Sequence, residues 1–189
     1  MNTNILIEPA AAVDAKLRLF TLYADFPAGV RAKRLVSRIA SRSGRKWAVT
    51  AEMWKLDSVT PIAAIRDLIA QEAGESDVLL IAISAVDQPE PAVIHWLNSL
   101  VNWKLNRPVP GLLVGLPGDE DRRADETNWL VDQLAAFARR TRMEFVWRAA
   151  GRDAAEDLDW LTAGLERLVD RRRACLAETD PALANVTTS

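Results

Sequence analysis

Three carboxylates stand where acid–base chemistry could occur in this chain. Asp25 follows one short apolar run, and Asp87 and Glu90 follow another. Neighbouring carboxylates can transfer protons or hold a divalent cation. Aspartates in such loops more often cap helices or shape turns, because their side chains accept hydrogen bonds from nearby backbone N–H groups. We therefore expect no catalytic residue, and the interpretation leans against an enzyme.

Histidine and cysteine are too scarce for the commonest metal and nucleophile sites. The single histidine, His95, shares a helical stripe with polar residues only, which predicts that it faces solvent. The single cysteine, Cys175, follows a run of arginines and has no second cysteine to form an intrachain disulfide. We expect no metal site and no disulfide.

Five short apolar runs alternate with segments of helical spacing. This alternation predicts an α/β fold, a doubly wound five-stranded parallel sheet with helices on both faces. The run at 78–83 is continuously apolar and predicts a central strand, whereas polar residues in the run at 47–56 predict an edge strand. The expected strand order is therefore 2-1-3-4-5. The runs are Leu17–Tyr23, Trp47–Leu56, Val78–Ile83, Leu112–Leu116 and Phe145–Trp147.

The helical segments lie between and after these runs. Proline and glycine set the expected ends, with Pro61 opening the second helix and Gly74 closing it. In that helix Ile62, Ile65, Leu68 and Ile69 are expected to face inward. The same spacing predicts inward faces for three other helices: Ala28, Ala32, Leu35, Val36, Ile39 and Ala40 in the first, Leu130, Leu134, Phe137 and Ala138 in the fourth, and Leu158, Leu161, Leu165 and Leu168 in the fifth. The expected ranges are 28–43, 62–74, 90–107, 126–142 and a last helix from about residue 157.

The length of 189 residues predicts one domain with two tails. We expect an N-terminal arm over 1–15, a single domain over 16–176 and a disordered tail over 177–189. Within the arm, Ile5–Ile7 could add a short edge strand, but Pro9 and the alanines after it favour a loosely held segment. The composition, the net charge of −2 and the lack of a long apolar run favour a cytoplasmic protein without a membrane span.

Ligands of doubly wound sheets bind beyond the carboxyl ends of the strands, where the strand order reverses. The residues at these ends form the candidate ligand-binding loops of this chain. They are Asp25, Phe26, Ala28 and Gly29 after the first run, Ser84 and Asp87 after the third, and Gly118 after the fourth.

Short motifs around these loops resemble flavodoxins. The matching segments are Leu22–Asp25, Ser76–Ile81 and Leu113–Asp119. The resemblance implies FMN as a cofactor, with its phosphate held at the start of the first helix by hydroxyl and backbone N–H groups. The chain departs from that pattern because residues 24–36 contain no serine or threonine, and Asp25 would repel a phosphate.

The same topology resembles response-regulator receiver domains. Asp25 fits the acidic position of such domains, but Ser84 stands where the phosphoacceptor aspartate belongs, and Leu116 and Arg148 replace the conserved hydroxyl and lysine. The leading hypothesis is a non-enzymatic receiver-like or flavodoxin-like interaction or regulatory module, with no cofactor expected. The alternative is an FMN- or nucleotide-binding protein, for example a reductase; the lone Gly29 is a poor match to a dinucleotide fingerprint.

Two helical surfaces could meet a partner. The third helix carries two apolar rows, more than one buried stripe requires, which predicts a homodimer or a protein partner with Trp96 or Trp103 at its centre. The first helix carries a basic row that could bind an anion or an acidic partner. Nucleic acid is not expected, since no aromatic residue interleaves with these arginines. The candidate interface is Val93, Trp96, Leu100 and Trp103, and the candidate anion-binding face is Arg31, Arg34, Arg38 and Arg42.

Overall fold

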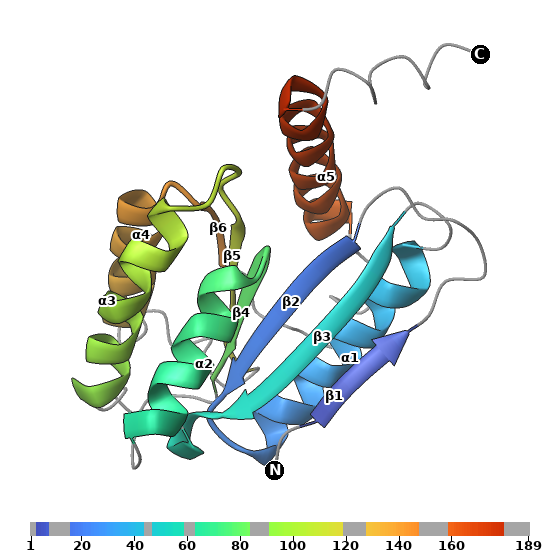
Figure 1. Ribbon diagram of the computed structural model, residues 1–189. Helices are drawn as coiled ribbons and strands as arrows, with labels where there is room; N and C mark the ends of the chain where they lie inside the picture. The colour runs from blue at the N-terminus through green and yellow to red at the C-terminus, as the bar shows by residue number, and fades with distance from the viewer. Residues whose placement is uncertain are drawn as a thin grey trace.

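A six-stranded sheet forms the centre of the computed structural model, which describes residues 3–7, 16–43, 47–58, 63–83, 91–118, 128–147 and 159–179. Its order is β1-β3-β2-β4-β5-β6, and β2 to β6 are parallel (Figure 1). These five strands confirm the expected order 2-1-3-4-5. The strands are β1 Thr3–Ile7, β2 Lys16–Tyr23, β3 Ala48–Lys55, β4 Val78–Ala82, β5 Leu112–Leu116 and β6 Glu144–Trp147.

The sixth strand, β1, pairs antiparallel with β3, from Thr3 opposite Met53 to Ile7 opposite Val49. The prediction that the run at 47–56 is the sheet edge was therefore wrong, and β1 lies within the segment expected to be an arm. The polar residues that suggested an edge have another cause. Val49, Ala51 and Met53 are buried, while the alternate residues of β3 point to the other face of the sheet and are only partly covered.

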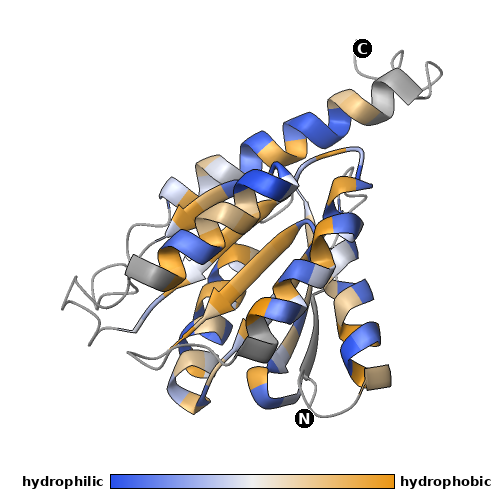
Figure 2. Cartoon of the chain, turned by 90° about the vertical axis from the view of Figure 1, so that its left-hand side faces the viewer, coloured by the Kyte–Doolittle hydropathy of each residue, from blue (hydrophilic) through white to orange (hydrophobic). Residues whose placement is uncertain are grey.

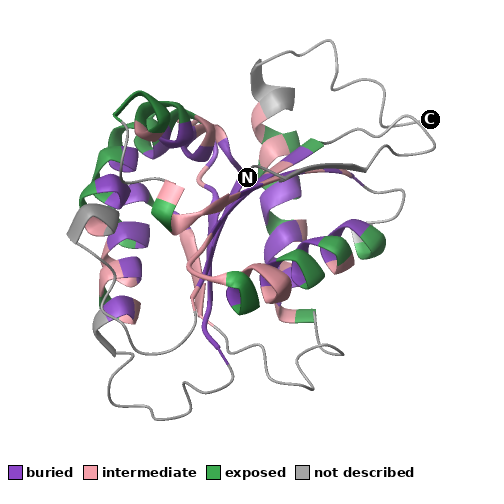
Figure 3. Cartoon of the chain, turned by 90° about the horizontal axis from the view of Figure 1, so that it is seen from below, coloured by how far each residue is buried: buried purple, intermediate pink, exposed green. Residues whose placement is uncertain are grey.

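Two helices cover one face of the sheet and three cover the other (Figures 1 and 3). On one face α1 and α5 enclose a core with β2 and β3, and on the other α2, α3 and α4 enclose a second core with β4. Figure 2 shows apolar strands between helices that alternate polar and apolar turns. The helices are α1 Phe26–Ser43, α2 Ala63–Glu75, α3 Pro91–Leu105, α4 Asn128–Thr141 and α5 Asp159–Thr179, with a short 3-10 turn at Leu56–Ser58.

Helical spacing identified most of the buried positions correctly. The inward residues expected for the first and fourth helices are all buried, and so are the three that are described in the fifth. No helix in the described ranges is long and apolar enough to cross a membrane. These buried positions are Ala28, Ala32, Leu35, Val36, Ile39 and Ala40 in α1, Leu130, Leu134, Phe137 and Ala138 in α4, and Leu161, Leu165 and Leu168 in α5.

The prediction for α2 was only partly correct. Ile69 is buried, but Leu68 is 52% exposed and Ile65 is also exposed; Ile62 lies outside the described residues. The cause is the close approach of α3, because a Cβ on Gly74 would lie 2.5 Å from the Cβ of Trp103. Small residues must therefore form the contact face of α2, which turns the larger Leu68 away from the core.

Candidate functional site

The carboxyl ends of β2, β4 and β5 meet at one edge of the sheet, as the topology requires. The backbone N–H of Ala24 donates to the carbonyl of Ala82 at 3.0 Å, and that of Ile83 donates to the carbonyl of Leu116 at 3.1 Å. The loops after these three strands therefore start side by side. Ser84 and Asp87 lie outside the described residues, and Gly118 is buried just beyond β5.

Asp25 caps the first helix with its own side chain. Its Oδ1 accepts a hydrogen bond from the backbone N–H of Ala28 at 2.8 Å, and its carbonyl accepts one from Gly29 at 2.9 Å. Pro27, in the same turn, has no N–H to offer. The start of α1 is therefore occupied by a carboxylate from the chain itself, which leaves little of the N–H cradle that binds phosphate at helix N-termini.

Aromatic residues frame this helix start. Phe26 is 81% exposed, the highest value among the large apolar side chains that the structure describes. Tyr23 packs against Gly29, where a Cβ would lie 3.0 Å from Tyr23 Cδ2. Four of the candidate loop residues, Asp25, Phe26, Ala28 and Gly29, thus form one turn. The carboxylate and carbonyl of Asp25 accept hydrogen bonds from the Ala28 and Gly29 N–H groups of the same turn.

The basic row on α1 does not form a single free face. Arg31 turns toward the strand ends and donates to the carbonyl of Ile83 at 2.7 Å, beside the switch in strand order. Arg42 pairs with Asp159 of α5 at 3.1 Å. Arg34 and Arg38 remain on the outer side of α1, where they contribute to an open pocket of about 640 Å³. The anion-binding face, which stays a prediction, is thus reduced to this outer pair and its neighbours.

The candidate interface on α3 is divided between the core and the surface. Trp96 and Leu100 are completely buried, and the Trp96 ring lies 6.2 Å from that of Phe20 between their centroids. Trp103 is 45% exposed, and the side chain of Val93 lies outside the described set. Trp96 and Leu100 therefore belong to the core of one chain. The expected homodimer stays a prediction that rests on Trp103.

The most densely connected polar group lies at the opposite, amino-terminal edge of the sheet, around Asp77. This carboxylate is 2% exposed. Its Oδ1 lies 2.5 Å from Arg107 Nη2, its Oδ2 lies 2.6 Å from Arg172 Nη1, and Oδ2 also accepts the backbone N–H of Arg18 at 2.8 Å. Asp77 therefore connects β2, the loop after α3 and α5, at the entry to the central strand β4.

Lys104 lies buried beside this group. Its ammonium donates to the carbonyl of Ser76 at 2.7 Å and to Ser76 Oγ at 3.0 Å. Burial away from water lowers the pKa of Lys104 to about 7; repulsion from Arg107 adds to this effect and Asp77 opposes it. The lysine therefore connects the end of α3 to the loop before β4. Its charged form is disfavoured there, because burial removes the ammonium group from water.

Acidic residues of α2 complete the network. Arg18 pairs with Glu72 at 2.8 Å and with Glu75 at 2.7 Å, and its hydrogen bond lowers the pKa of Glu75. Burial, together with the charge of Glu72, raises the pKa of Glu52 on β3. A cavity of about 10 Å³ beside these side chains has room for roughly one water molecule.

This network joins secondary structure elements, and both carboxylate oxygens of Asp77 are engaged within it. In the described part of the chain, no three potential metal-ligating His, Cys, Asp or Glu residues gather together. Sequence reasoning missed the network. The available signal was an aspartate directly before a wholly apolar strand, together with arginines far away in the sequence.

The lowered pKa of Lys104 predicts a pH dependence of stability. Between about pH 7 and the ordinary lysine value near ~10.4, the unfolded chain binds a proton that the folded chain does not. The free energy of unfolding should therefore rise with pH across this window, by up to roughly 1 kcal/mol per pH unit. Urea titrations at several pH values measure this slope. A Lys104→Met variant should lose it, and an equal slope in that variant would contradict the assignment.

Comparisons with known proteins agree with the architecture. No protein-family model and no curated protein sequence matches this chain. Among solved structures, rubredoxin oxygen:oxidoreductase from Desulfovibrio gigas is similar over 82% of this chain and 36% of its own, with 12% identity and a TM-score of 0.50. A short-chain flavodoxin associated with a non-canonical PDU bacterial microcompartment is similar over 80% of this chain and 97% of its own, with 12% identity and a TM-score of 0.49.

The flavodoxin of Pseudomonas aeruginosa is similar over 82% of this chain and 95% of its own, with 12% identity and a TM-score of 0.43. The chain has a flavodoxin-like fold. Sequence identity at this level supports a similarity of fold only, because proteins that share a fold can differ in function. In the flavodoxin-like sheet, Asp25 lies at the point where the strand order reverses. The ability of this chain to bind a ligand there depends on the residues of that turn.

Proposed function

We propose that this flavodoxin-like domain is a non-enzymatic interaction or regulatory module that binds no FMN. The observation that supports the proposal most is the cap that Asp25 places on the Ala28 N–H. A phosphate at this helix start would have to displace a carboxylate and would meet its negative charge. Pro27 removes a further donor from the same turn.

The proposal includes the absence of receiver-type phosphotransfer. Asp25 is already engaged as a helix cap, and no second acidic side chain follows β2 directly. A lone carboxylate binds Mg²⁺ weakly. A cytosolic location and a homodimer or protein partner belong to the same proposal, supported by the composition and by the exposed Trp103.

Titration with FMN tests the proposal against its alternative. We expect colourless purified protein and no change in flavin fluorescence up to tens of micromolar FMN, an affinity no stronger than about −6 kcal/mol. The natural chain and an Asp25→Gly variant, which frees the Ala28 N–H, should be compared. Yellow protein, or saturable binding by the natural chain, would overturn the proposal.

Incubation with acetyl phosphate and Mg²⁺ tests the second part of the proposal. We expect no stable phosphate incorporation by intact-mass measurement, because Asp25 is the helix cap and lacks an acidic neighbour. Incorporation at Asp25 or Asp87, lost in the matching Asp→Asn variant, would contradict a module without phosphoacceptor chemistry.

A further inference from the structure

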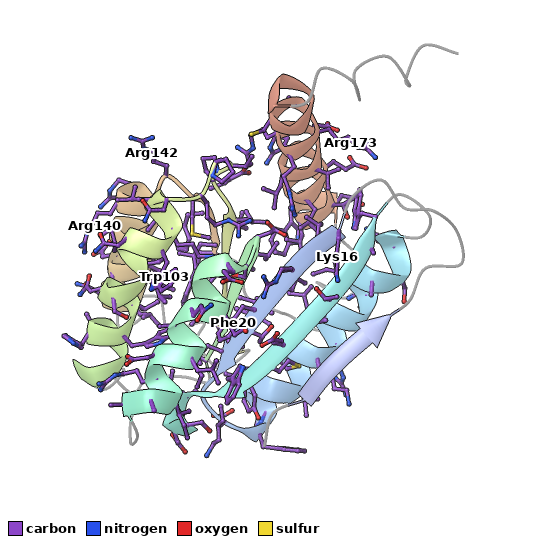
Figure 4. The ribbon with its side chains drawn as sticks, in the orientation of Figure 1. Lys16, Phe20, Trp103, Arg140, Arg142 and Arg173 are labelled. Atoms are coloured by element: carbon purple, nitrogen blue, oxygen red, sulfur yellow. The ribbon has the colours of Figure 1, made fainter. Side chains whose placement is uncertain are left out.

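Exposed cations gather at the amino-terminal edge of the sheet, opposite the loops considered above. Figure 4 shows Arg140 and Arg142 on the upper left, Arg173 on the upper right, and Lys16 at mid-height on the right, at about the level of Trp103 on the left. We define the basic edge as the exposed cations Lys16, Arg139, Arg142, Arg171 and Arg173. They come from β2, from the end of α4 and from α5, so folding brings together three distant parts of the chain.

Contacts at this edge show that the elements carrying these cations adjoin one another. Glu144, two residues after Arg142, lies 3.6 Å from Arg171 and also pairs with Arg167. Arg172, between Arg171 and Arg173, donates to the backbone carbonyl of Lys16 at 2.6 Å. The end of α4, the start of β6, α5 and the start of β2 therefore adjoin one another.

Acidic residues neutralise only part of this edge, where Glu144 pairs with Arg171 and Arg167. Asp77 is buried beneath two arginines, and Glu72 and Glu75 are both paired with Arg18. Within the described residues, no acidic side chain pairs with Arg139, Arg142 or Arg173. The outermost groups of the edge are therefore cationic, although the whole chain carries a net charge of −2.

Helix dipoles explain only part of this arrangement. Arg139 and Arg142 lie at the end of α4, where cations stabilise the exposed carbonyl groups. Arg171 and Arg173 lie inside α5, which continues to Thr179. The dipole effect is confined to the last turn of a helix. Arg171 pairs with Glu144, which leaves Arg173 as the cation that neither the dipole nor an ion pair explains.

We propose that the basic edge docks an acidic segment of a partner protein. This inference rests on the proposed role as an interaction module and specifies its partner. Arginine and exposed tryptophan are enriched at the centres of protein interfaces, and half-exposed Trp103 lies on α3 just before Lys104, which is anchored at this edge. Complementary charge would steer the acidic segment to the edge and set its orientation.

Nucleic acid fits this surface less well than an acidic protein segment does. Glu144 and Asp170 lie among the cations, so the surface carries charges of both signs. Protein–DNA interfaces are much more positive than protein–protein interfaces, and a surface of mixed charge is typical of the latter.

Fluorescence anisotropy with labelled poly-L-glutamate at low ionic strength tests the inference. The edge variant carries Arg139→Gln, Arg142→Gln and Arg173→Gln, three cations without ion-pair partners among the described residues. The control variant carries Lys33→Gln, Arg34→Gln and Arg38→Gln, which removes the same charge from the rival anion-binding face on α1 and so distinguishes the two candidate surfaces. We expect the edge variant to bind about tenfold more weakly and the control to stay within about twofold of the natural chain.

Each other result would overturn the inference. Equal weakening in the two variants would indicate a general charge effect, and a larger loss in the control would place binding on α1. Tighter binding of duplex DNA than of poly-L-glutamate would favour nucleic acid, and an absence of poly-L-glutamate binding would reject the basic edge as a docking surface. The FMN titration is independent of these outcomes, so failure here leaves the proposed module itself separately testable.

Discussion

Replacing Asp77 by asparagine should lower the free energy of unfolding by about 3 kcal/mol, because it removes the charge that Arg107 and Arg172 share. The amide keeps the shape of the side chain and can still accept the backbone N–H of Arg18. The loss therefore reports the buried charge and not a cavity. Urea denaturation at neutral pH, followed by circular dichroism, measures it.

An Asp170→Asn variant is the matched control for Asp77. Asp170 is exposed on α5 and carries the same charge, so its replacement should change stability by less than about 0.5 kcal/mol. A loss in Asp77→Asn no larger than that of the control would mean that the two arginines are satisfied by solvent, and that Asp77 does not hold α5 against the sheet.

Replacing Gly115 by alanine should destabilise the protein by about 2 kcal/mol through overpacking. A Cβ at this position would lie 2.1 Å from Cε3 of Trp147, on the neighbouring strand β6. The indole is rigid and lies across β5, so it can make room only if the whole ring moves. Thermal and urea unfolding of the variant measure the cost.

A double-mutant cycle identifies the cause of that cost. In a Trp147→Leu background the same Gly115→Ala change should cost much less, since a flexible side chain replaces the ring. Gly164→Ala provides a control that should raise the free energy of unfolding. Gly164 lies inside α5, where alanine favours the helix, and the nearest neighbour of its new Cβ would be 3.5 Å away. An equal cost of Gly115→Ala in both backgrounds would exclude Trp147 as the cause.

The turn at Asp25 is the observation that supports the proposal that this flavodoxin-like domain binds no FMN. The sequence already indicated both the missing hydroxyl groups and the acidic residue. The structure adds that the carboxylate occupies the N–H of Ala28 and that Arg31 reaches the end of β4. At the start of α1, the Asp25 carboxylate, the Ala28 N–H and the Arg31 guanidinium therefore all make contacts within the chain.

The sequence by itself determined the parallel sheet, its strand order and the inward faces of α1, α4 and α5. These features depend on patterns a few residues long, because burial of an apolar side chain in a strand or helix repeats with the period of that element. The 78–82 strand was recognisable as central because helices on both faces leave no polar position in it.

Only the tertiary structure decided which surfaces are free and which polar groups meet. β1 covers β3 although its sequence reads as an arm, and contact with α3 turns Leu68 outward while Trp96 enters the core. Asp77, Arg107 and Arg172 are distant in the sequence and come within hydrogen-bond reach after the sheet and α5 have packed. Such contacts leave no local period in the sequence, because their energy depends on neighbours that the fold alone supplies.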